Sequence, residues 1–349
     1  MPSDSMKSIQ ISHRYGSYEV RFESIDSAIE RLPSDLRIIT DTNVVQHFGP
    51  LLEAKAPVVM IDPGEQSKSL KSYGSLLSWL AKTKASRKTM ICALGGGVVG
   101  DLAGFVAATY MRGVPFYQIP TSLLAQVDSS VGGKVGVDLV EGKNLAGAFY
   151  PPSGVSIDVA VLRTLPVNQF VNGMAEVWKY AFIMDAGLTE PLAAEGWGVE
   201  HPALGEVVRR CIALKAEVVQ GDEFETLGLR AILNFGHTVG HAVEYAVGYG
   251  NILHGEAISI GMVVEAKLGE MLGMTRKGVT QEVSQYLANQ GLPTTHSILK
   301  SERALLSAMY GDKKAAGGNL AFSLLSDIGR CKLVESVPEA TVLAAMRES

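Results

Sequence analysis

Cysteine is scarce in this chain of 349 residues, which contains only Cys92, Cys211 and Cys331. An odd number of widely spaced cysteines excludes a framework of paired disulfides, and no Cys-x-x-Cys metal motif is present. No uncharged apolar run approaches the ~18 residues that span a bilayer, and no apolar signal region opens the chain. Positive charge is not in excess, since the formal net charge is -5, which argues against general binding of nucleic acid. We therefore expect a cytoplasmic protein that binds neither membranes nor nucleic acid.

Strand signals are concentrated in the first half of the chain. Short apolar runs suited to buried strands occur at residues 36–40, 58–61, 90–94 and 114–119, and helix-like segments separate several of them. Such alternation predicts a mostly parallel sheet with helices on both faces. Beyond about Pro152 the pattern changes to long amphipathic or apolar stretches at 170–184, 204–220, 230–247 and 256–272, with one strand-like piece at 320–325. The sequence predicts a Rossmann-like α/β domain over 1–155 and an all-α domain over 156–349.

Three of the seven histidines lie close together in the sequence, at His237, His241 and His254. His237 and His241 are four residues apart, so they share one face of a helix. Two of these imidazoles and one distant carboxylate would form a three-ligand zinc site with an open position. The alternative is a helix packed through two hydrogen-bonded histidines. The zincin motif is excluded, because Thr238 stands where that motif needs a glutamate.

A glycine-rich turn follows the apolar run at 90–94. Gly95, Gly97 and Gly100 have the spacing of a turn that brings backbone close to a pyrophosphate at a helix N-terminus. No acidic residue lies about 20 positions downstream, so a tight strand–helix junction is the alternative. If a nucleotide binds here, other loops at the carboxyl ends of strands could hold its ribose and phosphates. Their candidate residues are Asp41, Asn43, Glu65 and Lys68.

Two further segments carry charged residues that suggest chemistry. Residues 120–134 are rich in Gly, Ser and Thr and end in Lys134, and Lys143 follows nearby. Two lysines beside donor-rich backbone suit an anionic substrate, most simply a phosphate, although two solvated surface lysines would give the same pattern. Glu176 and Lys179 are three apart in a predicted helix and share a face. A carboxylate in an apolar helix needs a partner, which would be this lysine or a metal.

Taken together, these motifs resemble the 3-dehydroquinate synthase family of the sugar-phosphate cyclase superfamily. The matching segments span most of the chain in the family's order: 64–69, 95–105, 110–113, 120–134, 141–144, 174–179, 234–241, 254–256 and 312–314. The resemblance implies an N-terminal NAD domain, a C-terminal metal domain and an active site in the cleft between them. The family converts 3-deoxy-D-arabino-heptulosonate 7-phosphate into 3-dehydroquinate and phosphate in the shikimate pathway. It does so by transient oxidation with NAD, phosphate elimination, re-reduction and intramolecular aldol closure.

The resemblance also implies roles for single residues. Glu176, His237 and His254 become the ligands of a divalent zinc or cobalt ion, and His241 becomes a contact of the substrate phosphate. Implied catalytic residues are Asp128, Lys134, Lys179, Arg230, Asn234 and His241. Implied substrate contacts are Arg112, Lys134, Asn144, Lys215, Glu225, Arg230, Asn234, His241 and Lys313. Implied NAD contacts are Asp41, Asn43, Glu65, Lys68, Gly95, Gly96, Gly97, Val98, Val99, Gly100, Asp101, Thr121, Ser122, Asp128, Lys134, Lys143 and Thr164.

The substrate implied by the resemblance is a phosphorylated sugar acid. Arg112, Lys134, Asn144, Asn234, His241 and Lys313 would hold its phosphate, Lys215 and Arg230 its carboxylate, and Lys179, Asp128 and Glu225 its hydroxyls. A homodimer is also implied, with Arg112 reaching the neighbouring site. The chain departs from the family pattern at a one-residue insertion near Glu225 and at Ser122, Val135 and Asp138. Val135 and Asp138 lie beside the segment 120–134, which is expected to bind the phosphate, and could alter substrate choice.

Three other functions are compatible with parts of this pattern. A different sugar-phosphate cyclase, such as an amino-dehydroquinate synthase or one that makes an aminocyclitol or valiolone precursor, would share the NAD and metal residues. Lys215, Arg230 and the segment 128–134 argue instead for a substrate with a carboxylate. A metal-dependent polyol dehydrogenase would not need so many phosphate-binding cations. A non-enzymatic sensor or scaffold would tolerate the loss of metal ligands, and none is lost.

Overall fold

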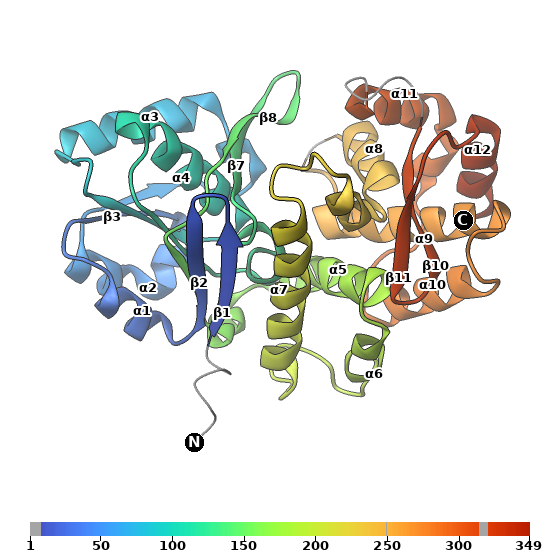
Figure 1. Ribbon diagram of the computed structural model, residues 1–349, viewed down its shortest axis with the longest axis horizontal. Coiled ribbons are helices and arrows are strands. Elements are labelled where there is room, and N and C mark those ends of the chain that lie inside the picture. The colour runs from blue at the N-terminus through green and yellow to red at the C-terminus, as the bar shows by residue number, and fades with distance from the viewer. Residues whose placement is uncertain (1–7, 249, 314–319) are drawn as a thin grey trace. The chain divides into compact units, whose positions relative to one another are not determined.

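The computed structural model describes residues 8–248, 250–313 and 320–349 and divides the chain into two compact units (Figure 1). Unit 1 comprises the described residues of Met1–Pro166 together with Val208–Phe224. Unit 2 comprises Val167–Val207 and the described residues of Glu225–Ser349. The predicted ranges 1–155 and 156–349 differ from these units, because residues 156–166 and 208–224 belong to unit 1.

Unit 1 is built around a sheet of seven strands in the order β1-β2-β9-β6-β5-β3-β4. All neighbouring strands pair in parallel except β1 and β2, which are antiparallel. The strands are β1 (Ser8–His13), β2 (Gly16–Phe22), β3 (Leu36–Asp41), β4 (Val58–Ile61), β5 (Met90–Gly95), β6 (Phe116–Pro120) and β9 (Gly154–Ile157). The helices are α1 (Ile25–Arg31), α2 (Thr42–Lys55), α3 (Leu70–Lys82) and α4 (Gly97–Thr109), and most of α7 (Leu204–Gly221) also lies here. This is the α/β architecture that the alternating pattern predicts.

Alternate side chains of the central strands enter two different cores, because successive residues of a strand point to opposite faces. Ile38 and Leu94 pack with apolar residues of α1 and α2, whereas Ile39 and Ala93 pack with α3 and α4. The sheet is therefore buried on both faces, as parallel sheets usually are. Its strands read as continuous apolar runs for this reason.

A second sheet in unit 1, the hairpin of β7 (Lys134–Leu139) and β8 (Gly142–Phe149), is absent from the sequence prediction. Gly136 pairs directly with Gly147, and a Cβ atom at Gly147 would lie 2.3 Å from the carbonyl oxygen of Val135. The strands approach closely only because these positions lack side chains. The same glycines remove the alternating apolar pattern by which a strand is recognised.

Unit 2 is mainly helical, and its core is arranged around α9 (His254–Met271). Its other helices are α5 (Val167–Ile183), α6 (Thr189–Leu192), α8 (His237–Val247), α10 (Val279–Asn289), α11 (Glu302–Lys313) and α12 (Glu339–Glu348). The predicted strand at 320–325 is β10 (Phe322–Asp327), which forms a hairpin with β11 (Arg330–Val334). The helical unit therefore contains this one hairpin among its described residues. No helix of the described residues is long and apolar enough to cross a membrane.

The pattern at 230–247 indicates one continuous helical stretch, but the structure divides it into two helices. A 3-10 helix, Leu229–Asn234, is followed by a break, and α8 begins at His237. The break is at Gly236, whose φ of 81° lies in the left-handed region that favours glycine. His237 therefore stands at the first turn of α8, where its direction is set by the break.

Helices α8 and α9 meet at glycines. A Cβ atom at Gly261 of α9 would lie 1.9 Å from the carbonyl oxygen of Gly236, and one at Gly240 of α8 would lie 2.6 Å from the side chain of Ile258. We expect Gly261→Ala to reduce the free energy of unfolding by about 1–3 kcal/mol, because the added methyl overpacks this crossing. Urea unfolding measures the change. Gly205→Ala in α7 is the control, since nothing lies within 4 Å of its Cβ position, and a loss of equal size there would contradict the explanation.

Candidate active site

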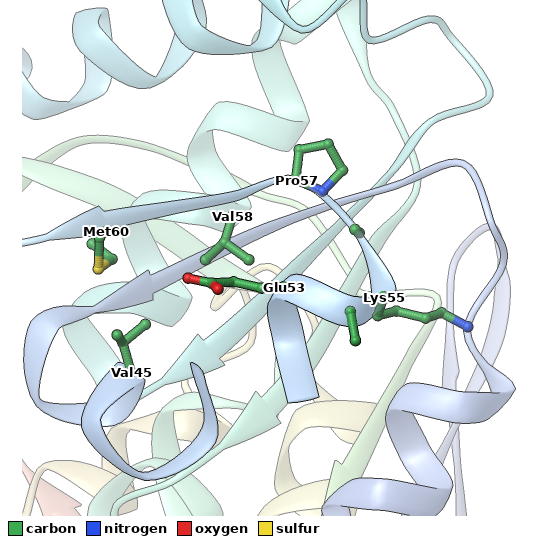
Figure 2. Close-up of a pocket in the computed structure, with 8 residues that line it drawn as sticks. Val45, Glu53, Lys55, Pro57, Val58 and Met60 are labelled. Carbon is green, nitrogen blue, oxygen red and sulfur yellow. The ribbon is translucent and has the colours of Figure 1, made fainter. Parts of the chain in front are cut away.

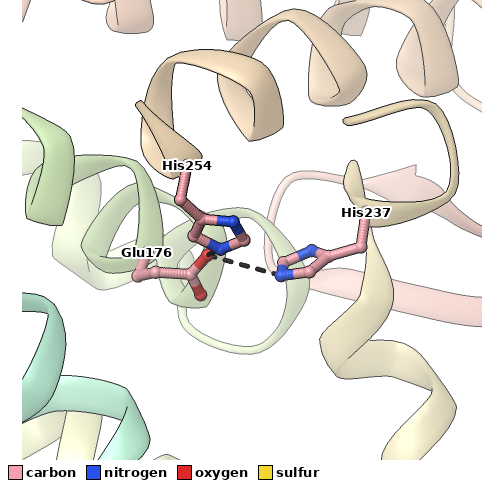
Figure 3. Close-up of side chains that lie close together, drawn as sticks. All are labelled: Glu176, His237 and His254. Carbon is pink, nitrogen blue, oxygen red and sulfur yellow. Dashed lines mark ion pairs between the residues drawn. The ribbon is translucent and has the colours of Figure 1, made fainter. Parts of the chain in front are cut away.

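Three side chains that are far apart in sequence converge in unit 2 (Figure 3). Glu176 lies on α5, His237 is the first residue of α8 and His254 is the first residue of α9. Glu176 Oε1 lies 3.5 Å from His237 Nε2 and 3.6 Å from His254 Nε2. One ligand atom from each residue lies within 4.8 Å of the other two. The structure thus brings together the three residues that the family resemblance implies as metal ligands.

Backbone contacts hold the starts of the helices in place. Gly255 N–H donates to Asn172 Oδ1 at 2.5 Å, which joins the start of α9 to α5 one turn before Glu176. Buried Glu265 of α9 accepts hydrogen bonds from Gly236 N–H at 2.7 Å and Val239 N–H at 3.1 Å. These are N–H groups at the start of a helix, which have no partner within the helix itself. Glu265 thus fixes the turn that carries His237.

Each histidine of the cluster turns one ring nitrogen toward Glu176 and the other toward a different acceptor. His237 Nδ1 lies 3.2 Å from the carbonyl oxygen of Phe235, so it carries the proton and donates it there. His254 Nδ1 lies 3.3 Å from Glu244 Oε2. In both rings Nε2 then faces the common centre with Glu176 Oε1. Outer partners of this kind orient metal-binding imidazoles and select their tautomer.

The charge of Glu176 is held by its neighbours despite deep burial. Burial raises the pKa of this carboxyl, but Lys179 and the two histidines outweigh it and keep the pKa well below the usual value. Lys179 forms an ion pair with Glu176 Oε2 and is itself buried. Burial and the nearby Lys179 charge lower the pKa of His237 to about 3, so this ring is neutral. Burial also disfavours charge on His254, but hydrogen bonds to Glu176 and Glu244 raise its pKa to about 9.

The donor set fits a divalent metal such as zinc. Glu176 Oε1 is buried, and two imidazole nitrogens face it at 3.5 and 3.6 Å. Carboxylate oxygen and imidazole nitrogen are ordinary ligands of zinc, and three protein ligands leave one position open. A neutral His237 offers its Nε2 lone pair without losing a proton. The site can therefore hold a cation that still accepts an external ligand.

His241 lies one turn after His237 on the same helix and is partly exposed. Its ring centroid is 5.3 Å from that of His237 and 6.1 Å from that of His254. A second group of possible ligand atoms consists of His241, Glu244 and His254. Glu244 was missed by the sequence analysis, although it follows His237 by seven residues and so returns to the same helix face.

The other predicted site residues of unit 2 lie on the 3-10 helix before α8 and on the segment that leads to it. Arg230 is buried, and its Nε lies 3.4 Å from Glu225 Oε1. Glu225 is exposed and has a φ of 57°. Asn234 is exposed at the end of the 3-10 helix. Lys313 is the last residue of α11, and its side chain lies outside the described part of the protein.

The predicted cofactor residues of unit 1 lie largely at the carboxyl ends of three neighbouring strands. Asp41 ends β3, Gly95 ends β5, and Thr121 follows β6, with Thr121 N–H donating to the carbonyl oxygen of Gly95 at 3.0 Å. Helix α4 has no side-chain cap at Gly96, so its first N–H groups can bind an anion. The Asp41 carboxylate caps α2 by accepting from Asn43 N–H and Val44 N–H at 2.9 and 3.0 Å. These positions fit a pyrophosphate-containing cofactor.

Charged and polar residues surround this edge of unit 1. Lys215 of α7 pairs with Asp128 Oδ1 at 2.9 Å and also donates to the Asp128 carbonyl oxygen. Buried Lys68 pairs with Asp101 at 2.6 Å. Thr164 Oγ donates to the Val161 carbonyl oxygen. The remaining predicted residues are Lys134 at the start of β7, Lys143 and Asn144 on β8, Ser122 beside the glycine turn, Val98 and Val99 in the first turn of α4, Glu65 before Lys68, and Arg112 in the 3-10 helix Tyr110–Arg112.

A cavity of about 450 Å³ lies elsewhere in unit 1 (Figure 2). It is formed by the end of α2 and by β4, the edge strand of the sheet, and its lining includes Glu53, Lys55, Pro57 and Met60. None of the predicted site residues lines it. The cavity is therefore separate from the candidate active site.

Comparison with known proteins gives consistent matches over the chain. Residues 58–172 match the family model described as 3-dehydroquinate synthase N-terminal, and residues 173–315 match the one described as 3-dehydroquinate synthase C-terminal. The chain is 44% identical over 316 residues to a 3-dehydroquinate synthase of Opitutus terrae, covering 89% of this chain and 88% of that protein. It is also 44% identical over 321 residues to one from Desulforamulus reducens, covering 89% of each.

Solved structures with the same fold include synthases in complex with NAD+ and a metal ion. A 2-deoxy-scyllo-inosose synthase with carbaglucose-6-phosphate, NAD+ and Co2+ is 27% identical, with a TM-score of 0.83 over 98% of this chain and 100% of that one. ValA, a 2-epi-5-epi-valiolone synthase from Streptomyces hygroscopicus with NAD+ and Zn2+, is 27% identical, with a TM-score of 0.86 over 97% and 98%. A probable glycerol dehydrogenase from Sinorhizobium meliloti, at 15% identity and a TM-score of 0.58 over 93% and 92%, shares the fold alone.

Proposed function

The chain belongs to the 3-dehydroquinate synthase family, and from this premise we propose which of its residues carry out the reaction. The enzyme is a carbon–oxygen lyase that converts 3-deoxy-D-arabino-heptulosonate 7-phosphate into 3-dehydroquinate and phosphate. The main support for assigning the reaction to particular residues is that Glu176, His237 and His254 converge in the structure. The chain that contains them matches both family models. A role in the shikimate pathway and a cytoplasmic location are proposals that follow from this activity.

The cofactors are NAD and a divalent metal, which the related synthases also bind. We propose that Glu176, His237 and His254 hold the metal, as zinc or cobalt, since their atoms converge and fit its ligand preferences. We propose that NAD binds at the strand ends of unit 1, with its pyrophosphate on the uncapped start of α4. When bound, NAD supplies a transient hydride acceptor and the metal supplies Lewis acidity.

We propose that the chain's own residues bind and orient the substrate. Lys134, Asn144, Asn234, His241 and Lys313 offer hydrogen-bond donors to the phosphate. Lys215 and Arg230 hold the carboxylate, and each is already paired with a carboxylate of the chain, Asp128 or Glu225. Lys179 keeps Glu176 ionised and donates a hydrogen bond to a substrate hydroxyl. The carboxylates of Asp128 and Glu225 accept hydrogen bonds from other hydroxyls of the substrate. Such fixed groups lower the entropic cost of reaching a reactive geometry.

Substrate choice tests this assignment directly. The enzyme should release phosphate from the heptulosonate 7-phosphate at a kcat/KM at least about a hundredfold above that for a heptulose 7-phosphate without the carboxylate. Lys215 and Arg230 would lose their charged partner in the second compound, and one such charged contact is worth about 1.5–3 kcal/mol. Phosphate release measured for both substrates gives the ratio. Equal kcat/KM values would point to one of the other sugar-phosphate cyclases.

Metal affinity should depend on Glu244, which touches no proposed ligand atom of the metal. We expect Glu244→Gln to weaken zinc binding about 10–100-fold, because His254 loses the carboxylate that orients its ring. Competition with a chromophoric chelator measures the dissociation constant. Glu53→Gln, an exposed glutamate of unit 1, should leave it unchanged. Unaltered zinc affinity in Glu244→Gln would show that this contact does not support the site.

We infer a homodimer in which Arg112 acts at the neighbouring site. Met111 and Arg112 have φ angles of 49° and 67°, and the Met111 side chain is exposed, so the turn presents Arg112 in a conformation that non-glycine residues rarely adopt. If Arg112 acts in the other subunit, mixing inactive Arg112→Ala with inactive His254→Ala should restore about a quarter of wild-type activity through heterodimers with one complete site. No recovery after subunit exchange would place Arg112 in its own site.

A further inference from the structure

Lys68 has an unusual environment for a lysine, because its side chain is only 5% exposed. It follows the 3-10 helix Glu65–Ser67. Its ammonium lies 2.6 Å from Asp101 Oδ2 of α4 and 3.9 Å from Glu65 Oε1, and it donates a hydrogen bond to Asn144 Oδ1 of β8. Burial disfavours the charge, but Asp101 and Glu65 outweigh it and raise the pKa of Lys68. The group is therefore a permanently charged donor that joins three segments of unit 1.

Lys68, Asp138 and Asn144 form a closed ring of hydrogen bonds. The carbonyl oxygen of Lys68 accepts from Asp138 N–H at 2.8 Å. Asp138 Oδ1 accepts from Asn144 N–H at 2.8 Å, and Asn144 Oδ1 accepts from the Lys68 ammonium. Asn144 has a φ of 57°, a conformation that asparagine tolerates better than most residues. The ring therefore fixes the β7–β8 hairpin to the loop before α3 at the point where Asn144 lies.

The ring also decides which way the Asn144 amide points. An ammonium group has donors and no acceptor, so the amide oxygen must face Lys68. The amide nitrogen, with both of its N–H donors, is then directed to the other side, and Asn144 as a residue is exposed. The contact of Asp138 is likewise unambiguous, because the backbone N–H of Asn144 can only donate and Asp138 Oδ1 accepts it. The amide is thus held in one of its two possible orientations.

We propose that Lys68 and Asp138 are positioning residues, which hold the Asn144 amide with its N–H donors presented to the substrate phosphate. The proposal rests on the phosphate contact assigned to Asn144 above. It gives Lys68 a role at the phosphate end of the substrate in addition to any contact with NAD. It also gives a role to Asp138, a residue at which this chain departs from the family pattern.

The test separates substrate binding from cofactor binding. We expect Lys68→Met to raise the KM of the heptulosonate phosphate about tenfold or more at saturating NAD, because a donor to a charged phosphate is no longer held in place, whatever change in the NAD dissociation constant accompanies it. Lys71→Met, an exposed lysine of α3, is the matched control and should alter neither. A weakened NAD affinity with an unchanged KM would overturn the proposal.

A second pair of variants keeps the test decisive if Lys68→Met fails to fold because the partly buried Asp101 loses its ion-pair partner. Asp138→Ala removes the acceptor of the Asn144 backbone N–H and should raise the same KM. Asp138→Asn retains an amide oxygen as acceptor, so its KM should be close to that of the wild type. Equal KM values for the two variants would contradict the ring. Asn144→Ala tests the premise separately: if it leaves the KM unchanged, the proposal fails, while phosphate release by the wild type still establishes the synthase activity.

Discussion

Phosphate release by the His254→Ala variant will be about a thousandfold slower than by the wild type, even with saturating NAD and added metal. His254 Nε2 is one of three atoms that converge on the proposed metal position, and two ligands do not hold a divalent ion in the same geometry. Loss of Lewis-acid assistance removes several kcal/mol of transition-state stabilisation, and each 1.36 kcal/mol is a factor of ten in rate.

The measurement is the initial rate of phosphate release together with the metal content of the purified variant. His47→Ala is the control, because His47 is an exposed histidine of α2 in unit 1 and no role is proposed for it. A His254→Ala enzyme with more than a tenth of wild-type activity would remove this histidine from the metal site.

Replacing Glu176 by methionine will reduce the free energy of unfolding of the metal-free protein by about 3–5 kcal/mol. Glu176 and Lys179 form an ion pair, and each side chain has a relative exposure of only 2%. Removal of one partner of a buried pair leaves an uncompensated buried charge, which costs this amount. Replacement of both partners by apolar residues is often close to neutral.

The double variant Glu176→Met with Lys179→Met is therefore the internal control for this prediction. We expect it to be more stable than Glu176→Met alone, although it will be inactive, since it lacks both a metal ligand and the proposed hydroxyl contact. Urea unfolding in the presence of a chelator gives the three free energies. If the single and double variants are equally destabilised, the cost comes from lost packing and the charge of Lys179 is not the cause.

The parallel sheet can be predicted from the sequence because both of its faces are covered, which makes its strands apolar at nearly every position. Residues such as Ile38 and Ile39 enter opposite cores, so the strands are continuous apolar runs separated by helices. The β7–β8 hairpin has no recognisable strand pattern in the sequence, because the paired glycines Gly136 and Gly147 replace alternating side chains. The break at Gly236 is hidden for a related reason, since an apolar stretch continues through it.

The candidate site could be predicted only in part from spacing. His237 and His241 are adjacent on a helix, and spacing alone leaves either available to a metal. In the structure His237 lies beside His254 and Glu176, and Glu176 is 61 residues before His237 on another helix. Before the structure is known, only the family resemblance identifies these three residues as one set of ligands. Supporting residues such as Glu265 and Asn172 act through backbone N–H groups of other helices. A sequence carries no local signal for such contacts.

The division of the chain into units also depends on contacts that are distant in sequence. Helix α7 follows α5 and α6 of unit 2, yet its residues from Val208 onward belong to unit 1. Lys215 contributes to this, because it pairs with Asp128, 87 residues earlier. An amphipathic helix pattern shows that one face is buried, but it does not show against which partner.

The central claim is that the enzyme uses NAD and a metal within a cycle that ends without net oxidation. Phosphate release from 3-deoxy-D-arabino-heptulosonate 7-phosphate, followed beside the absorbance of reduced nicotinamide, tests it most directly. With NAD far below the substrate concentration, we predict that phosphate release continues over many turnovers, requires both NAD and metal, and leaves no accumulating NADH. Phosphate release that stops after one equivalent of NAD, with NADH building up in step, would contradict the cycle and indicate a dehydrogenase.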